Sequence, residues 1–451
     1  MSFSLDGLNA KIKKSEITIK VKASHPLIML ANEIPWDELW TVAAEDLKGS
    51  TAKGFWNRGR KLYIRPHLGI LLLQAVTKKT DRAIISELQE NAAYQLFCGI
   101  TVMDQWQIPH PTKVEEFRSR LSPPTKAKIN EVIVKKAVSC GLADPSVIDI
   151  DSTVQEANIS YPTDASNLLK LAKKAAQIAD GLRLEVKVNL KKISALARGY
   201  FFRGKCSKEA GDAALTRYFN LVKAEILPII TIAEDRIRTG AIKVKWNLKR
   251  AINQVGQHGR QYLKDAGFYV KNHRARVGKR LSFHAGEVAC ISKGKAGKPH
   301  EFGRVVQLMR TGGNFLLALC NNQVNLSDKK AIRPLLELHS KVFGEEKIKS
   351  LATDRGYFSE ENVKLANKAG VEEIGIQKSG VVSKLSVEEV RLRNRRAGIE
   401  PLIGHVKKFG LARSKMKSDA NTHGSGFTAI LGYNCSQWMR KIKPKRLKMA
   451  A

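Results

Sequence analysis

The spacing of the apolar residues changes along this chain, and each change limits what the segment can fold into. From residue 1 to about 138 the spacing is helical, and the residues that follow the start signal Thr80-Asp81 on one stripe are Ile84, Ile85, Leu88, Ala92 and Leu96. The segment SVIDIDSTV at 146–154 alternates apolar and polar residues and is rich in β-branched side chains, which predicts a strand. Helical spacing returns from Asn167 to about Tyr269. These patterns predict one strand between two helical regions.

The second half of the chain alternates between strand-like and helix-like segments. The strand-like runs are EVACIS, FGRVVQLM, NFLLALC, IKSLATD and VEEIGI, and the helix-like runs lie at 331–342, 360–368, 387–396 and after Pro401. Such alternation predicts an α/β domain. We expect three parts: a helical N-terminal domain at 1–138, an α/β domain at 139–440 with a helical insertion at 167–280, and a basic tail at 441–451.

The charge of the chain points to a polyanionic partner. Its 451 residues include 78 Lys plus Arg against 42 Asp plus Glu, a net charge of +36. Residues 241–310 hold 16 basic residues and 3 acids, and residues 391–451 hold 15 and 2. A single charge run is usually a solvated face, but two blocks that carry most of the excess favour contact with the phosphate backbone of DNA. The N-terminal domain is our candidate for reading bases, the alternative being that it only packs against the rest.

The sequence predicts a cytoplasmic protein without a membrane anchor. The longest apolar patches, such as 226–233, are much shorter than the roughly 20 residues that a bilayer span needs. The opening MSFSLDGLNAKIKK lacks the apolar core of a secretory signal. The six cysteines lie far apart without a CxxC pair, so neither a zinc ribbon nor a disulfide framework is expected.

Three carboxylates stand out because each ends or follows an apolar strand beside a turn. They are Asp151 in DIDST, Asp354 in ATDRGY and Glu400 in RRAGIEPLIGHVKK. Alone, each such acid is more often a cap or turn residue, but three that converge would supply the hard oxygen ligands that Mg²⁺ prefers. Asp149 competes with Asp151, because residues two apart on a strand point the same way. Asp164 is a further candidate, although a turn or cap role after Pro162 is favoured for it.

The segment around Glu400 adds basic residues at helical spacing. On an uninterrupted helix of 100° per residue, Arg396, Glu400 and Lys407 fall at 0°, 40° and 20° and would share a face. Pro401 disfavours helical geometry at Glu400, so the phase between Arg396 and Glu400 is open, while Pro401 itself fits the first turn of a helix. His405 falls near the opposite side, and no zinc site is expected.

These blocks together resemble the DDE transposases of bacterial insertion sequences. IDSTVQEANISYPTDASNLL resembles the block with the first catalytic Asp, KGKAGKPHEFGRVVQL the second core strand and its approach, and ATDRGYFSEEN the block with the second Asp. RRAGIEPLIGHVKKFGL resembles the Y-x2-R-x3-E-x6-K signature, with Arg393 in place of its Tyr, and DRAIISELQENAAYQLFCG resembles the helical segment before such cores. The separation of Asp151 from Asp354 places an insertion after the first core strand.

The resemblance implies a fold, a reaction and a set of partners. The α/β domain would hold an RNase H-like mixed-sheet core in which Asp151, Asp354 and Glu400 bind two Mg²⁺ ions, with Mn²⁺ as a possible substitute, for strand cleavage and strand transfer. The expected substrates are double-stranded DNA with terminal inverted repeats and target DNA, bound by a homodimer in the bacterial cytoplasm at the nucleoid. The expected DNA contacts are Arg396, Lys407, Arg393, Lys293 and Lys295.

Two other readings differ from this one in the outcome on DNA. One is a catalytically inactive transposase relic that binds DNA as a repressor, which the presence of all three acids disfavours. The other is an RNase H-like nuclease that cuts without joining. Both catalytic readings require the metal, so only joined products separate them.

Overall fold

The computed structural model describes two compact units. The described residues are 21–49, 64–100, 108–161, 163–203, 206–240, 245–282, 288–295, 298–378, 386–416 and 418–449. The first unit, called the core unit below, comprises Met1–Glu156, Val305–Ser414 and Ala420–Ala451, and the second, the inserted unit, comprises Ala157–Arg304 and Lys415–Asp419. Each unit is described by itself. The domain limits given above stay predictions.

The N-terminal part of the core unit is helical, as the apolar spacing predicts. The described helices are α1 (Pro26–Glu33), α2 (Trp36–Gly49), α3 (Ile64–Thr77), α4 (Asp81–Glu90), α5 (Ala92–Phe97), α6 (Pro111–Arg120) and α7 (Pro123–Ser139). Thr80 caps α4 by accepting a hydrogen bond from the Ala83 N–H. The predicted continuous stripe from Ile84 to Leu96 is wrong, because the backbone is extended at Asn91 and its side chain starts α5 by accepting from the Tyr94 N–H. Leu96 is consequently exposed.

The strands form one mixed sheet. They are β1 (Asp144–Glu156), β2 (Ala289–Lys295), β3 (Lys298–Gly312), β4 (Leu316–Ala318), β5 (Ser350–Thr353) and β6 (Glu373–Gly375), in the order β2-β3-β1-β5-β6 with β4 paired to β3. β1 pairs with β5 and β5 with β6 in parallel, whereas β2 and β4 each pair with β3 in antiparallel fashion. The predicted mixed-sheet α/β fold is confirmed.

The remaining elements of the core unit connect these strands and continue to the end of the chain. They are α12 (Asp328–Phe343), the 3₁₀ turn η2 (Arg355–Tyr357), α13 (Glu360–Lys368), α14 (Val387–Ala397), α15 (Ile399–Val406), the π-helical turn η3 (Lys407–Leu411) and α16 (Asp419–Met449). Pro401 is the third residue of α15, which confirms its predicted place in the first turn. The segment predicted as a basic tail is, through Met449, the last part of α16.

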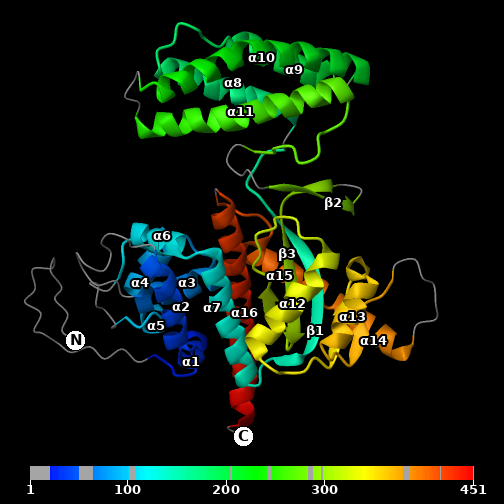
Figure 1. Cartoon of the computed structure of the whole chain (residues 1–451). Helices are drawn as coiled ribbons and strands as arrows, with labels where there is room; N and C mark the ends of the chain where they lie inside the picture. Colours follow the sequence, from blue (N-terminus) through cyan, green and yellow to red (C-terminus); the bar gives the residue numbers. More distant parts are fainter. Residues whose placement is uncertain are drawn as a thin grey trace, which may run out of the picture. The chain divides into compact units, whose positions relative to one another are not determined.

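One apolar core joins the N-terminal helices to the sheet. It includes the fully buried side chains of Leu72 on α3, Ile150 on β1, Leu351 on β5 and Trp438 on α16. In Figure 1, α7 and α16 run side by side between the N-terminal helices and the strands. A buried hydrogen bond of 2.8 Å from Asn434 Nδ2 to Asn130 Oδ1 links these two helices. The N-terminal helices therefore pack on the same core as the sheet.

The inserted unit is a helical block with a core of its own. Its helices α8 (Asp164–Gly181), α9 (Leu190–Arg203), α10 (Lys208–Arg238) and α11 (Trp246–Asn272) follow β1, so the helical insertion is found where the sequence predicts it. β2 and the first residues of β3 form a hairpin in the same unit. The Ala157 N–H donates to the Phe302 carbonyl at 2.8 Å, which brings the two ends of this long segment together. No helix in the described ranges has the length and apolarity of a bilayer span.

Lys126 on α7 generates a prediction about pH and stability. The side chain is 6% exposed, and burial, helped by the nearby Arg118, lowers the pKa of Lys126 to about 8. Between this pKa and the ordinary value near 10.5 the unfolded chain binds more protons, so the free energy of unfolding rises with pH in that window. We expect the Lys126→Met variant to lose this rise, and to be more stable than wild type at pH 7 by about 3 kcal/mol.

Urea unfolding at several pH values from 7 to 10.5 measures both quantities. The wild type and the variant share every other titrating group, so the difference between their unfolding free energies isolates Lys126. We expect this difference to shrink as the pH rises through the window. A difference that stays constant with pH would contradict the lowered pKa of Lys126.

Candidate functional site

The pairing of β1 with β5 brings two of the predicted acids together. The two strands are parallel, and their register pairs Asp149 with Ala352 and Ile150 with Thr353. Asp151 and Asp354 are the next residues on the two strands. Because the two strands are parallel and in register, both acids lie side by side at the level where β5 ends. β1 continues to Glu156, so the expectation that Asp151 ends its strand is wrong.

A buried tyrosine anchors the turn that carries Asp354 to the neighbouring sheet. Asp354 starts η2, and its Oδ1 accepts from the Arg355 N–H at 2.7 Å. Tyr357 ends this turn, is fully buried, and donates from its hydroxyl to Gln307 Oε1 on β3 at 2.5 Å. Burial raises the pKa of Tyr357 well above its usual value, so the phenol stays protonated as a donor. The second carboxylate oxygen of Asp354 is left to face the site.

Glu400 and Arg396 lie on either side of a break between two helices. α14 ends at Ala397, Gly398 links the helices, and α15 begins at Ile399. The backbone at Gly398 stays close to helical values, with φ −66° and ψ −11°, so the spacing of four residues still brings the two side chains together. Arg396 Nη1 contacts Glu400 Oε1 at 3.3 Å, which confirms their predicted common face.

A single guanidinium contacts all three acids. Arg396 Nη2 lies 2.9 Å from Asp151 Oδ2 and 3.6 Å from Asp354 Oδ2, in addition to the contact between its Nη1 and Glu400. Only 18% of the Arg396 side chain is exposed, against 12% for Asp151, 48% for Asp354 and 65% for Glu400. Residues separated by 249 positions in the sequence therefore meet at one cation.

The buried member of this group has a shifted pKa. Burial raises the pKa of Asp151 above its usual range, an effect opposed by Arg396 and by the Ser152 N–H, which donates to Asp151 Oδ1 at 2.7 Å. The negative charge of Asp354 acts in the same direction as burial. A cation beside these acids thus favours the ionised form of Asp151.

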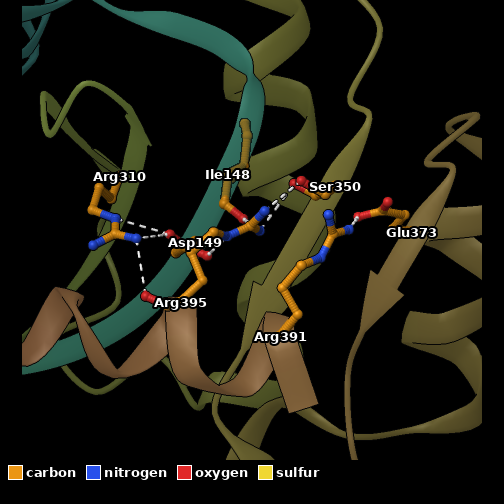
Figure 2. A network of polar contacts seen from close by, with 7 residues as sticks. All are labelled: Ile148, Asp149, Arg310, Ser350, Glu373, Arg391 and Arg395. Carbon is orange, nitrogen blue, oxygen red and sulfur yellow. Dashed lines mark hydrogen bonds and ion pairs between the residues drawn. The ribbon is translucent and has the colours of Figure 1, made fainter. Parts of the chain in front are cut away.

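The other acid of β1 has a different environment. Asp149 is almost completely buried, and Figure 2 shows its carboxylate between two arginines. Arg310 on β3 donates from Nε to Asp149 Oδ2 at 2.8 Å and also from Nη2, while Arg395 on α14 donates from Nε to Oδ1 at 2.9 Å. Arg395 also donates to the Ile148 carbonyl and to Ser350. Both oxygens of Asp149 are therefore used in joining β1 to β3 and α14.

Gly398 makes room for this arrangement. A Cβ at this position would lie 2.8 Å from Arg310 Nη1 and 3.1 Å from the Arg395 carbonyl oxygen. Arg310 Nη2 also donates to that carbonyl at 3.0 Å. A side chain at residue 398 would displace the guanidinium that binds Asp149, so the break between α14 and α15 needs glycine.

The other residues singled out in the sequence lie outside the group of three acids. Lys407 starts η3 and forms no ion pair with Asp151, Asp354 or Glu400. Arg393 is exposed on α14, one turn before Arg396.

The candidates in the inserted unit and around His405 have other roles or are not described. Lys293 and Lys295 lie in β2, but their side chains fall outside the described part of the chain. Asp164 is the first residue of α8 and pairs with Lys279 at 3.3 Å, in agreement with its favoured role at a helix end. His405 is exposed on α15.

The donor set of the three acids suits a divalent cation of the Mg²⁺ type. Across the described ranges, no group of three or more His, Cys, Asp or Glu side chains is arranged as a ready metal site. The carboxylates instead surround the Arg396 guanidinium, and two of them present Oδ2 to the same nitrogen atom. Hard carboxylate oxygens that already share a cationic partner have the chemistry that Mg²⁺ requires. Asp151, Asp354 and Glu400 would be its ligands.

Sequence reasoning missed the residues that support the acids. Arg310 lies in the apolar run VVQLMRTG, and a charged residue inside a buried strand is the signal that a partner must lie nearby. Arg395 adjoins Arg396, and in the sequence it is visible only as part of a basic block. Tyr357 stands in the ATDRGY block without a local signal for its role.

Comparison with known protein families gives two matches. Residues 15–120 match a transposase domain described as DUF772, and residues 272–435 match a transposase DDE domain. The second match includes Asp354 and Glu400 and begins after Asp151. A curated relative, the uncharacterized protein ORF8 in the nfe locus of Rhizobium meliloti, is 27% identical over 149 residues, which cover 32% of this chain and 68% of the relative. No solved structure matches the chain.

The geometry predicts that Asp149 contributes strongly to stability. In the Asp149→Ala variant two guanidinium groups lose their shared carboxylate inside the protein, and we expect the free energy of unfolding to fall by about 3–5 kcal/mol. The matched control is Glu373→Ala, which removes the β6 partner of Arg391, an exposed arginine of α14, and should change stability by at most about 1 kcal/mol. Chemical denaturation measures both, and equal small losses would contradict the supporting role of Asp149.

Proposed function

Since the chain belongs to the DDE transposase family, we propose that it cleaves DNA at the terminal inverted repeats of an insertion sequence and joins the ends to target DNA. A DDE domain implies an RNase H-like core, and the mixed sheet agrees with such a core. The observation that carries the proposal is the meeting of Asp151, Asp354 and Glu400 at the Arg396 guanidinium.

The three carboxylates would hold the metal that the reaction needs. Two bound Mg²⁺ ions, or Mn²⁺ in their place, supply activation of water or a 3′-hydroxyl and stabilisation of the leaving 3′-oxygen. Asp151 and Asp354 offer oxygens from adjacent strands, and Glu400 offers them from α15. Asp149 is not a ligand in this proposal, because two arginines occupy both of its oxygens. Arg396 and Lys407 would contact phosphates near the scissile bond, where negative charge develops.

DNA is the expected partner of the family, and the charge distribution supports an extended contact. The inserted unit carries 32 Lys plus Arg against 12 Asp plus Glu, whereas residues 1–138 carry 21 against 14. We therefore propose that the inserted unit supplies much of the attraction for the DNA backbone. The N-terminal helices stay our candidate for reading bases.

One face of α11 suits contact with DNA. At 100° per residue most of its exposed residues fall within a single stripe, which holds no acid. The stripe consists of Trp246, Arg250, Asn253, Gln257, Arg260, Lys264 and Lys271. α10 differs, because its sequence contains five acids and five basic residues, and Glu234 of α10 pairs with Arg260. Positive and amide side chains without acids are suited to phosphate oxygens.

The loop after α11 contributes less than its composition suggests. Arg276 Nη1 contacts the buried Asp265 carboxylate at 3.0 Å, and Lys279 pairs with Asp164. The Arg280 N–H also donates to Asp265 at 3.0 Å. These residues hold the loop to the helical block, whereas Arg274 is exposed, with its guanidinium over the Phe268 ring. We further propose a homodimer assembled on paired DNA ends in the bacterial cytoplasm.

The test of the proposed reaction uses the full chain on DNA from its own locus. Purified protein and Mg²⁺ are incubated with a fragment that contains the gene and its flanks, and new ends and joints are mapped by sequencing. Defined cuts at both boundaries with joined products would establish a transposase. Cuts without joints would favour the nuclease, and specific binding without cuts would favour the inactive relic.

The same assay tests the assignment of the acids. We expect Asp354→Asn to lower cleavage by at least about 1,000-fold, because even an outer partner of a metal ligand contributes about 10–100-fold and a ligand contributes more. Binding to DNA should persist. The matched control is Asp235→Asn, the same change at an exposed acid of α10, which should cleave like wild type. Full activity in Asp354→Asn would contradict the assignment.

The α11 stripe is tested by the salt dependence of DNA binding. Replacing Arg250, Lys264 and Lys271 by Gln should lower the slope of log affinity against log salt by about 0.9 for each phosphate that the protein no longer neutralises, or about 3 in all. The control replaces Lys208, Arg217 and Lys223, three exposed basic residues of α10, by Gln. Equal slopes for the two triple variants, measured by fluorescence anisotropy, would place the DNA path elsewhere.

A further inference from the structure

We propose that Arg396 is an internal countercharge for the three acids, which competes with divalent metal for them and is released when metal binds. This inference rests on the proposed function, because it takes Asp151, Asp354 and Glu400 to be the metal ligands. It assigns Arg396 a positioning role before DNA binds, in addition to the phosphate contact proposed above.

The first argument is the place of the guanidinium. Its Nη2 contacts Oδ2 of both Asp151 and Asp354, and its Nη1 contacts Glu400. The Asp151 and Asp354 oxygens can be no farther apart than the sum of their distances to Nη2, so the guanidinium lies among the groups that a metal would have to contact. Two cations cannot use the same carboxylate oxygens at full strength, so binding of one opposes binding of the other.

The second argument is the need for a positive charge in this place. Asp151 is largely buried, Asp354 follows the neighbouring strand, and like charges at short distance repel. Arg396 is the basic residue that pairs with these acids in the described part of the chain. It therefore offsets the repulsion between the carboxylates and holds them close together before any metal arrives.

The third argument is a contrast between two consecutive arginines. Arg395 binds Asp149 and also donates to the Ile148 carbonyl and to Ser350, so several backbone and side-chain groups fix it. The Nη atoms of Arg396 contact the three acids, and its buried Nε has no hydrogen-bond acceptor among the described residues. When another cation neutralises the acids, Arg396 loses the groups that hold it, while Arg395 keeps its own.

A consequence is a coupling between metal and DNA. A guanidinium released from the acids has free donors for a phosphate oxygen, which it lacks while it pairs with them. Because coupling between two ligands is reciprocal, a phosphate that binds Arg396 also favours metal at the acids.

The experiment measures Mn²⁺ binding to the full chain without DNA, by isothermal titration calorimetry. In Arg396→Gln the competing charge is gone, and we expect Mn²⁺ to bind at least about tenfold more tightly than in wild type. The matched control is Arg391→Gln. Arg391 is an exposed arginine on the same helix as Arg396 and pairs with Glu373 of β6, so this variant should bind Mn²⁺ like wild type. Arg396→Lys keeps the positive charge, and its Mn²⁺ affinity should lie between those of wild type and Arg396→Gln.

Thermal melting separates this role from a merely structural one. Without metal, Arg396→Gln should melt at a lower temperature than wild type, because the acids lose their countercharge. Saturating Mn²⁺ should narrow this gap between the two melting temperatures. A gap of the same size with and without Mn²⁺ would indicate a structural role and would overturn the inference. If Arg396→Gln does not fold, Arg396→Lys carries the comparison, and unchanged Mn²⁺ affinity in that variant would overturn the inference as well.

The Asp354→Asn variant distinguishes failure of this inference from failure of the proposed function. Mn²⁺ binding that is abolished in Asp354→Asn but is not tightened in Arg396→Gln would overturn the countercharge role alone. Mn²⁺ binding that is unchanged in Asp354→Asn would overturn the metal site, and both proposals with it. Tightening in Arg396→Gln that disappears when Asp354→Asn is added supports both.

Discussion

The ion pairs of Asp149 fix the geometry on which the rest of the site depends. A carboxylate without water is costly, and it is tolerated here because two guanidinium groups bind both of its oxygens. One arginine comes from β3 and the other from α14, so a single acid of β1 sets where the neighbouring strand and the helix lie. Removal of Asp149 alone is costly, because both arginines would then lose the carboxylate that compensates their charge inside the protein.

The site follows from this support by simple steps along the chain. Asp151 lies two residues beyond Asp149 on β1, and Arg396 follows Arg395 on α14, so the supporting pair and the functional pair are offset in register. The strand period carries the acid to the same face, and the helix carries the next arginine toward it. The Asp149 pair is buried and joins β1 to β3 and α14, whereas in our proposal the more accessible acids around Arg396 exchange this arginine for metal.

The sequence was most informative where local patterns determine the outcome. The strand at 146–154, the helical insertion and the acid after β5 could be predicted, because alternation, apolar stripes and the end of β5 are visible in single segments. The break at Asn91 could not be predicted, because the helical spacing of the apolar residues continues across it from α4 to α5. The partners Arg310 and Arg395 depend on contacts between distant segments, which no local pattern contains.

The hydrogen bond between Ala157 and Phe302 bears on how the sheet can assemble. β1 and β3 are neighbours in the sheet, yet α8 to α11 and β2 lie between them in the sequence. In an unfolded chain the two strands would have to meet at the ends of a long flexible loop, which carries a loop-closure entropy and slows folding. Once α8 to α11 have packed on their own core and the two ends are joined, that loop is effectively short. The rate at which β1 and β3 pair therefore depends on the folding of the helices of the inserted unit.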